Sequence, residues 1–165
     1  MTWSEWRELN EQMIGIIRYY DKETVPLVAG FDWAYDLTGY RYEPIRADNI
    51  GFVSHPYSNK RTQPWEPKWE EDFGFMADSH PVIATEIGFE LKDGEAMTDD
   101  SYGNRITRYL ESRGISWVAW VFDPDWGPRM LKSFNGFELR SDGTFFKEAM
   151  HRAPAPIPPP PKPAP

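Results

Sequence analysis

Four short apolar runs alternate with segments of helical periodicity along this chain, and that alternation restricts its fold more than any other feature. The runs are Val25 to Ala29, Ile50 to Ser54, Val82 to Thr85 and Ser116 to Phe122. They are largely continuous in hydrophobicity, as in strands that are covered on both faces. Strands of this kind that are joined through helices pair in parallel with right-handed crossovers. The sequence therefore predicts an α/β fold with four parallel strands.

The helices are predicted from apolar residues that recur every three or four positions. Thr2 and Glu5 form a capping-box pattern ahead of the first of them. The predicted helical segments are Trp6 to Tyr20, the stretch with Trp69, Phe73 and Met76, Tyr102 to Leu110, and Phe145 to His151, with a helical turn at Arg129 to Phe134 and a loop or short helix at Tyr40 to Asp48.

The proline content divides the chain into a folded part and a tail. Eight of the sixteen prolines lie between Pro154 and Pro165, in a stretch with almost nothing that could pack. Such a segment is typical of an extended linker. We therefore expect one domain at residues 1–152 and a proline-rich tail at residues 153–165.

Composition excludes several classes of function. The formal charge of -8 argues against a nucleic-acid partner. No apolar run approaches the length of a membrane span, and the polar stretch Met1 to Glu5 does not resemble a signal peptide. The absence of cysteine excludes disulfides and thiolate metal sites. No metal site is expected. The acidic residues between positions 90 and 100 lack the spacing of a calcium-binding loop, and their pattern is typical of a solvated loop. They are Glu90, Asp93, Glu95, Asp99 and Asp100.

Polar and aromatic residues gather where the apolar runs end. Glu86 follows the third run, His55 and Tyr57 follow the second, and Trp120 lies in the fourth. In parallel α/β folds the carboxyl ends of the strands display the catalytic groups. Tryptophan has a flat apolar face and a polar edge that suit stacking against a sugar ring. The pattern therefore indicates a sugar-cleaving site.

Each of these residues also has a purely structural interpretation. Glu86 could pair with an arginine at a strand end, and His55 could cap a loop. Tyr57 and Trp33 could pack in the core. Trp120 could lie between helices rather than inside a barrel.

Three motifs together resemble glycoside hydrolase family 5, the cellulase and mannanase family of the retaining clan. They are Pro81 to Gly88, His55-Pro56-Tyr57 and Trp117 to Trp120, and the likeness runs from Trp6 to His151. The resemblance implies the C-terminal half of a (β/α)8 (TIM) barrel, with four strands equivalent to strands 5–8. It implies Glu86 as the nucleophile, His55 and Tyr57 as contacts of the nucleophile and the sugar, and Trp120 as a sugar platform. It further implies a secreted protein that acts on a β-linked polysaccharide or oligosaccharide without a cofactor.

The sequence departs from the family pattern in one respect. The family carries its acid/base glutamate in an Asn-Glu-Pro motif on strand four, but Asn10-Glu11 is followed by Gln12 inside a predicted helix. The sequence thus contains the nucleophile strand without an acid/base strand. The bare inner face of a half barrel is expected to be covered by a homodimer partner or by a complementing N-terminal half. In a homodimer, Asp123 of the second copy could replace the missing acid.

Two functions remain open at this stage. One is a retaining endo-β-1,4-glucanase or mannanase, in which Trp33 and Trp126 provide further sugar platforms. The other is a non-catalytic half barrel that assembles as a dimer, or one half of a split enzyme. The choice among glucan, mannan and xylan also stays open.

Overall fold

The computed structural model describes residues 1–91 and 95–152. The predicted linker at 153–165 and Asp93 of the acidic loop lie outside these residues. The described chain forms one four-stranded parallel sheet in the order β1-β2-β3-β4, which confirms the predicted α/β class. The strands are β1 (Leu27–Ala29), β2 (Gly51–Val53), β3 (Val82–Ile87) and β4 (Ser116–Ala119).

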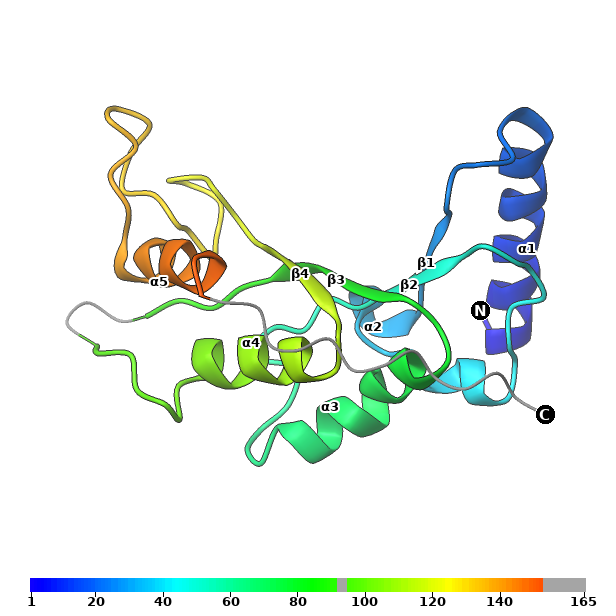
Figure 1. Ribbon diagram of the computed structural model, residues 1–165, viewed down its shortest axis with the longest axis horizontal. Coiled ribbons are helices and arrows are strands. Elements are labelled where there is room, and N and C mark those ends of the chain that lie inside the picture. Colours follow the sequence, from blue (N-terminus) through cyan, green and yellow to red (C-terminus); the bar gives the residue numbers. More distant parts are fainter. Residues whose placement is uncertain (92–94, 153–165) are drawn as a thin grey trace.

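Helices and 3-10 turns connect and flank the strands (Figure 1). They are α1 (Trp3–Tyr20), α2 (Phe31–Ala34), η1 (Thr38–Arg41), α3 (Glu66–Asp72), η2 (Gly74–Asp78), α4 (Tyr102–Ser112) and α5 (Ser141–Met150). The capping box is present: the Glu5 amide donates to the Thr2 hydroxyl, and the Thr2 amide donates to the Glu5 carboxylate. Its two reciprocal bonds satisfy amides that the first turn of α1 leaves free.

Three predictions near the C-terminus differ from the structure. The fourth strand ends at Ala119 rather than Phe122, because the next residues bond to a returning loop: the Val121 amide donates to Pro128 O. No helical turn forms at 129–134, where Leu131 instead makes an antiparallel bridge with Leu139. The last helix begins at Ser141, four residues before the apolar pattern that predicted it.

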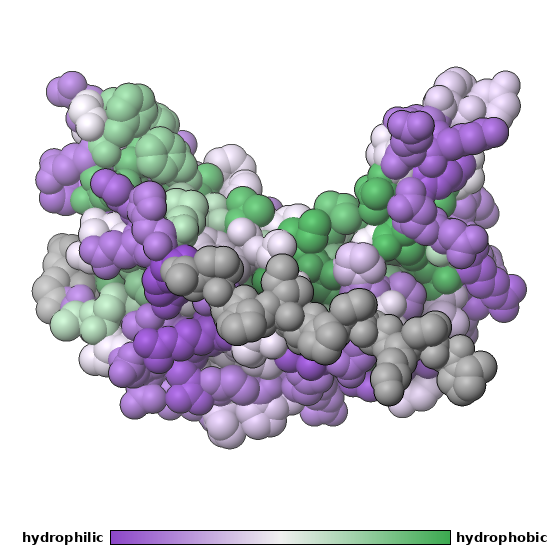
Figure 2. All heavy atoms as spheres, in the orientation of Figure 1, coloured by the Kyte–Doolittle hydropathy of each residue, from purple (hydrophilic) through white to green (hydrophobic). Residues whose placement is uncertain are grey.

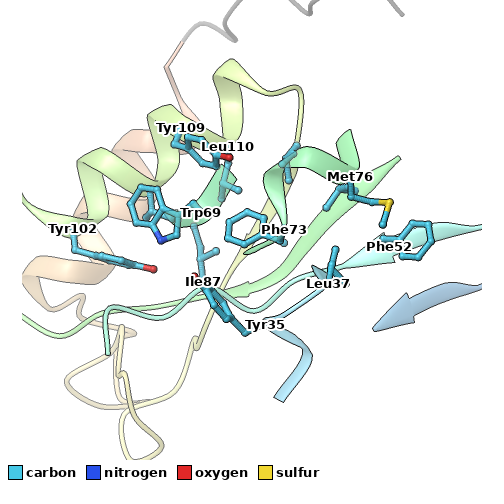
Figure 3. Close-up of a cluster of buried hydrophobic side chains, with 14 of the residues drawn as sticks. Tyr35, Leu37, Phe52, Trp69, Phe73, Met76, Ile87, Tyr102, Tyr109 and Leu110 are labelled. Carbon is cyan, nitrogen blue, oxygen red and sulfur yellow. The ribbon is translucent and has the colours of Figure 1, made fainter. Parts of the chain in front are cut away.

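The core lies between the sheet and the helices that cover one of its faces. α3 and α4 lie together on that side in Figure 1. Fully buried aromatic and aliphatic side chains fill the layer, among them Trp69, Phe73, Ile87 and Leu110, as Figure 3 shows. Burial of each large apolar side chain stabilises a fold by about 1.5–3 kcal/mol. This layer is therefore the main stabilising contribution to the fold.

The opposite side of the sheet is open. α1 and the segment leading to α5 rise at its two ends, and Figure 2 shows apolar residues in the hollow between these projections. Within the described residues β1 and β4 are the edge strands. Exposed apolar side chains on or beside α1, β1 and β4 include Met13, Ile16, Val25, Leu27, Val118 and Phe122. Parallel sheets normally have both faces covered, and apolar edges favour association.

None of the helices in the part of the chain that the structure describes is long and apolar enough to cross a membrane.

Candidate active site

A bulge in β3 turns the Glu86 side chain toward the open side of the sheet. Between Ala84 and Ile87 β3 advances three residues, whereas its neighbour β4 advances two, from Trp117 to Ala119. Without the extra residue the two-residue period of a strand would place Glu86 on the same face as Ala84, under the helices. Ala84 and Ile87 are instead fully buried, while Thr85 and Glu86 are both partly exposed. The bulge therefore brings a carboxylate out of the core.

Tyr57 contacts this carboxylate directly. Its hydroxyl donates to Glu86 Oε2 at 2.6 Å, and its backbone forms a parallel bridge with Gly88. Burial and the neighbouring Glu86 raise the pKa of Tyr57 far above its ordinary value, so the phenol stays protonated as a donor. Gly88 permits this approach, because a Cβ there would lie 2.4 Å from Pro128 Cγ and 3.0 Å from Tyr57 Cε1.

His55 lies near the same carboxylate oxygen that accepts from Tyr57. Its Nδ1 is 3.6 Å from Glu86 Oε2, and its Nε2 is 2.8 Å from the Thr85 hydroxyl. Its backbone amide donates to Ala34 O. Burial lowers the pKa of His55, with a smaller lowering by Lys60 and an opposing rise from Glu86. The imidazole is therefore uncharged at neutral pH.

An open cavity of about 530 Å³ brings these groups together. Its lining residues are Trp33, Ala34, His55, Tyr57, Asn59, Lys60 and Glu86. Glu86 is the only carboxylate among them. Within the described residues no group of three or more His, Asp or Glu side chains could hold a metal ion.

The short element α2, which carries Trp33, departs from helical backbone geometry inside its bounds. Asp32, Trp33 and Ala34 have φ values of 54°, 55° and 62°, in the left-handed region that side chains other than glycine seldom adopt. Lys60 holds this segment, since its ammonium donates to Asp32 O at 2.8 Å and to Asp32 Oδ1 at 2.9 Å. Trp33 is 84% exposed at the wall of the cavity. Strained backbone of this kind gathers at binding sites, where the surrounding contacts maintain it.

The other candidate residues lie beyond the cavity wall. The rings of Trp120 and Trp126 meet edge to face at 6.1 Å, and the Trp120 amide donates to Ile87 O at the end of β3. Asp123 Oδ1 accepts the backbone amides of Asp125 and Trp126, and these bonds lower the pKa of Asp123. An ionised carboxylate is favoured there.

The Asn10-Glu11 pair lies inside α1 and bonds to its own surroundings. Asn10 is buried and donates to Trp6 O, while Glu11 accepts the Arg46 amide. Neither residue lines the cavity.

Thr85 and Lys60 are site residues that the sequence did not reveal. The pattern around Thr85 predicts only an ordinary strand residue. Its contact with His55 depends on the bulge in β3. Lys60 lies in a polar loop with no periodicity. The hydrogen-bond partners of both follow only from the tertiary structure.

Polar and aromatic side chains gathered at the carboxyl ends of parallel strands are typical of α/β enzymes, and comparison with known proteins specifies the family. The family model for cellulase (glycosyl hydrolase family 5) matches residues 1–125. The chain belongs to glycosyl hydrolase family 5.

Two curated relatives are endoglucanases. Endoglucanase E-5 of Thermobifida fusca is 24% identical over 132 residues, which are 76% of this chain and 28% of that protein. An endoglucanase of Clostridium saccharobutylicum is 23% identical over 146 residues, or 84% of this chain and 32% of that protein. The chain thus spans about a third of the length of these relatives.

The solved structures agree on the fold. The β-glucanase SdGluc5_26A of Saccharophagus degradans superposes with a TM-score of 0.83 at 42% identity, over 91% of this chain and 48% of that one. The same β-glucanase has been solved in complex with cellotetraose. Cellulase Cel5C_n matches with a TM-score of 0.73 at 21% identity, which supports the fold. The described four-stranded sheet corresponds to about half of these barrels, as predicted.

Proposed function

We propose that this chain supplies the nucleophile half of a retaining β-1,4-glucanase site, with Glu86 as the nucleophile. The observation that carries the proposal is the position of Glu86: a bulge turns it out of the core into an open cavity, where Tyr57 donates to it at 2.6 Å. A carboxylate that served only the fold would be expected to pair with a cation. Within the described residues, Glu86 forms no ion pair with a lysine or arginine, and the basic side chain beside it is His55, whose pKa is lowered by burial.

The contacts suggest a role for each group in the reaction. Glu86 attacks the anomeric carbon, and the glycosidic bond breaks as the ester to Glu86 forms. Tyr57 and His55 hold the attacking carboxylate in one orientation. A water molecule then hydrolyses the ester and regenerates the carboxylate. The proposal requires no metal or organic cofactor.

The proton donor is proposed to come from another polypeptide segment. A retaining site needs a second carboxyl group at about 5–5.5 Å from the nucleophile, and Glu86 is the only carboxylate among the cavity-lining residues. Asp123 of a second copy is the weaker source, because backbone bonds lower its pKa and a general acid must carry a proton. We favour an acid on a complementing half barrel.

That complementing half would also cover the open side of the sheet. Its strands would pair in parallel with the free edges of β1 and β4, next to the exposed side chains of Leu27 and Val118. The solved relatives are about twice as long as this chain, which supports a second half of similar size. A homodimer is the alternative occupant of the same surface.

The proposed substrate is a β-1,4-linked glucan, cleaved internally. The endoglucanase relatives and the cellotetraose complex of the 42% identical β-glucanase support a glucan over a mannan. Trp33 would provide one platform at the cavity wall, and Trp120 with Trp126 a second platform beyond it. A polymeric substrate implies action outside the cell, which we include in the proposal.

Hydrolysis of a soluble β-1,4-glucan tests this function. The chain is assayed alone and after mixing with the N-terminal half of the S. degradans β-glucanase, and the mass of each species is determined by light scattering. Activity that depends on the added half and is lost in Glu86→Gln supports the proposal. An active dimer of the chain alone would favour a homodimer with its own acid. A stable complex or dimer without activity would identify a non-catalytic half barrel.

A further inference from the structure

The turn after β1 that carries Trp33, residues 31–36, is closed at its ends by the fold. Phe31 and Asp36 form an antiparallel bridge, in which the Phe31 amide donates to Asp36 O at 2.9 Å and the Asp36 amide donates to Phe31 O at 3.0 Å. Tyr35 and Leu37 beside the bridge are fully buried. The two ends of the turn therefore stay in place when a contact at its tip is removed.

The tip of the turn has a conformation that local preference disfavours. Asp32, Trp33 and Ala34 all have positive φ values, where the Cβ atom crowds the backbone. Two contacts from the segment after β2 reach this tip. The His55 amide donates to Ala34 O at 3.0 Å, and the Lys60 ammonium donates to Asp32 O at 2.8 Å and to Asp32 Oδ1 at 2.9 Å. Only the second contact is made by a side chain, so a substitution removes it and leaves the backbone bond intact.

The Lys60 ammonium also lies beside the ring that this tip presents. It is 5.4 Å from the centroid of the Trp33 indole, a distance at which a cation is attracted to the π face. The Lys60 side chain is only 14% exposed, which is unusual for a lysine without a partner. It nevertheless lines the cavity that contains Glu86. Lys60 thus connects the Trp33 turn with the wall of the proposed active site.

We propose that Lys60 is a positioning residue for sugar binding, which fixes the turn in advance so that Trp33 stands ready as a platform. A ring that is fixed before binding loses less conformational freedom when a sugar stacks on it. The effect of Lys60 on affinity therefore passes through Trp33. The inference rests on the proposed function for the identity of the ligand, whereas the dependence of the turn on Lys60 does not.

A direct role in binding is the competing explanation. An ammonium has three hydrogens, and Asp32 takes two of them, so one is left that a sugar hydroxyl can accept. In that case Lys60 would contribute to affinity with or without the Trp33 ring, and its removal would leave the turn unchanged. The two explanations therefore differ both in the free chain and in the complex.

The conformation of the turn can be measured in the full chain without any ligand. Spin couplings of Hα to the amide proton and to Cα differ between positive and negative φ, and they are recorded by NMR for the wild type and Lys60→Met. Lys68→Met is the matched control, because the Lys68 ammonium also donates to one carbonyl and one side-chain oxygen, Thr62 O at 2.6 Å and Thr62 Oγ1 at 3.1 Å. Circular dichroism checks that each variant is folded.

The wild type and Lys68→Met are expected to show positive-φ couplings at Trp33 and Ala34, and Lys60→Met is expected to lose them. Unchanged couplings in Lys60→Met, or the same loss in Lys68→Met, overturn the inference. Because these couplings are read without ligand and without hydrolysis, a failure of the proposed function leaves them interpretable.

A double-mutant cycle then tests whether the effect passes through the ring. Cellotetraose is titrated into Lys60→Met, Trp33→Ala and the double variant, each combined with the complementing N-terminal half. Lys60→Met is expected to weaken binding by no more than the about 2- to 12-fold of one stacked ring. In the Trp33→Ala background it is expected to change affinity by less than about twofold. Equal weakening in both backgrounds would show a direct sugar contact and overturn the inference.

Discussion

The bond between Tyr57 and Glu86 gives the sharpest quantitative prediction. Tyr57→Phe removes one hydroxyl and leaves the ring that lines the cavity. Hydrogen bonds to charged groups contribute about 1.5–3 kcal/mol. If this bond orients the nucleophile in the transition state, its loss lowers kcat/KM by roughly 10- to 150-fold.

The assay is hydrolysis of a soluble β-1,4-glucan by the chain combined with a complementing N-terminal half. Tyr109→Phe is the matched control, because the Tyr109 hydroxyl makes the same type of bond to Glu70 Oε2, at 2.7 Å, between α4 and α3 on the covered side of the sheet. Both variants should lose stability, and only Tyr57→Phe should lose activity beyond twofold. Equal activity in the two variants would refute the claim that Tyr57 acts on the nucleophile.

Three further predictions concern stability and binding. Asp72→Asn should lower the free energy of unfolding by about 1–3 kcal/mol in a urea titration. The reason is that the Asp72 carboxylate accepts from the Tyr35 hydroxyl at 2.6 Å and from the partly exposed Arg61 guanidinium at 2.8 Å. An unchanged midpoint of the titration would contradict this prediction. Trp33→Ala should weaken cellotetraose binding by the complemented site about 2- to 12-fold in calorimetry, because the exposed ring would stack on a sugar. Stability should change little, since the ring is largely exposed and meets the Lys60 ammonium only at 5.4 Å from its centroid. Unaltered affinity would remove Trp33 from the site. Burial lowers the pKa of His55, so the unfolded chain binds more protons below the ordinary value of about 6.5 and stability should fall as pH drops through that window. His55→Gln should flatten part of this dependence, and an unchanged slope would mean that other groups cause it.

The sheet could be predicted from the sequence because its strands are continuous apolar runs. Burial on both faces leaves a strong signal, and the parallel order follows from the helices between the runs. The orientation of Glu86 could not be predicted in the same way. Counting by two from Ala84 places it under the helices, and only the register shift against β4 reverses that result. A bulge has no signature in this stretch of sequence.

The conformations of two segments could not be predicted from the sequence, for one shared physical reason. Asp32 to Ala34 adopt left-handed conformations that their own residue types disfavour, and the contacts of Lys60 hold them there. In the segment after β4, apolar residues suggested a helical turn, whereas Leu131 pairs with Leu139 across a returning loop. In both cases contacts between distant residues outweigh local preference.

Covalent trapping of the nucleophile tests the central claim most directly. A cellobiosyl fluoride with fluorine at C2 carries a leaving group that needs no proton donor, so attack by Glu86 does not depend on a general acid. The chain is incubated with this reagent, alone and with the complementing half, and digested for mass spectrometry. We predict one added 2-fluorocellobiosyl group on the peptide that contains Glu86, and none in Glu86→Gln. A sugar attached to any other residue, or no label in the assembled barrel, would contradict the assignment of Glu86 as the nucleophile.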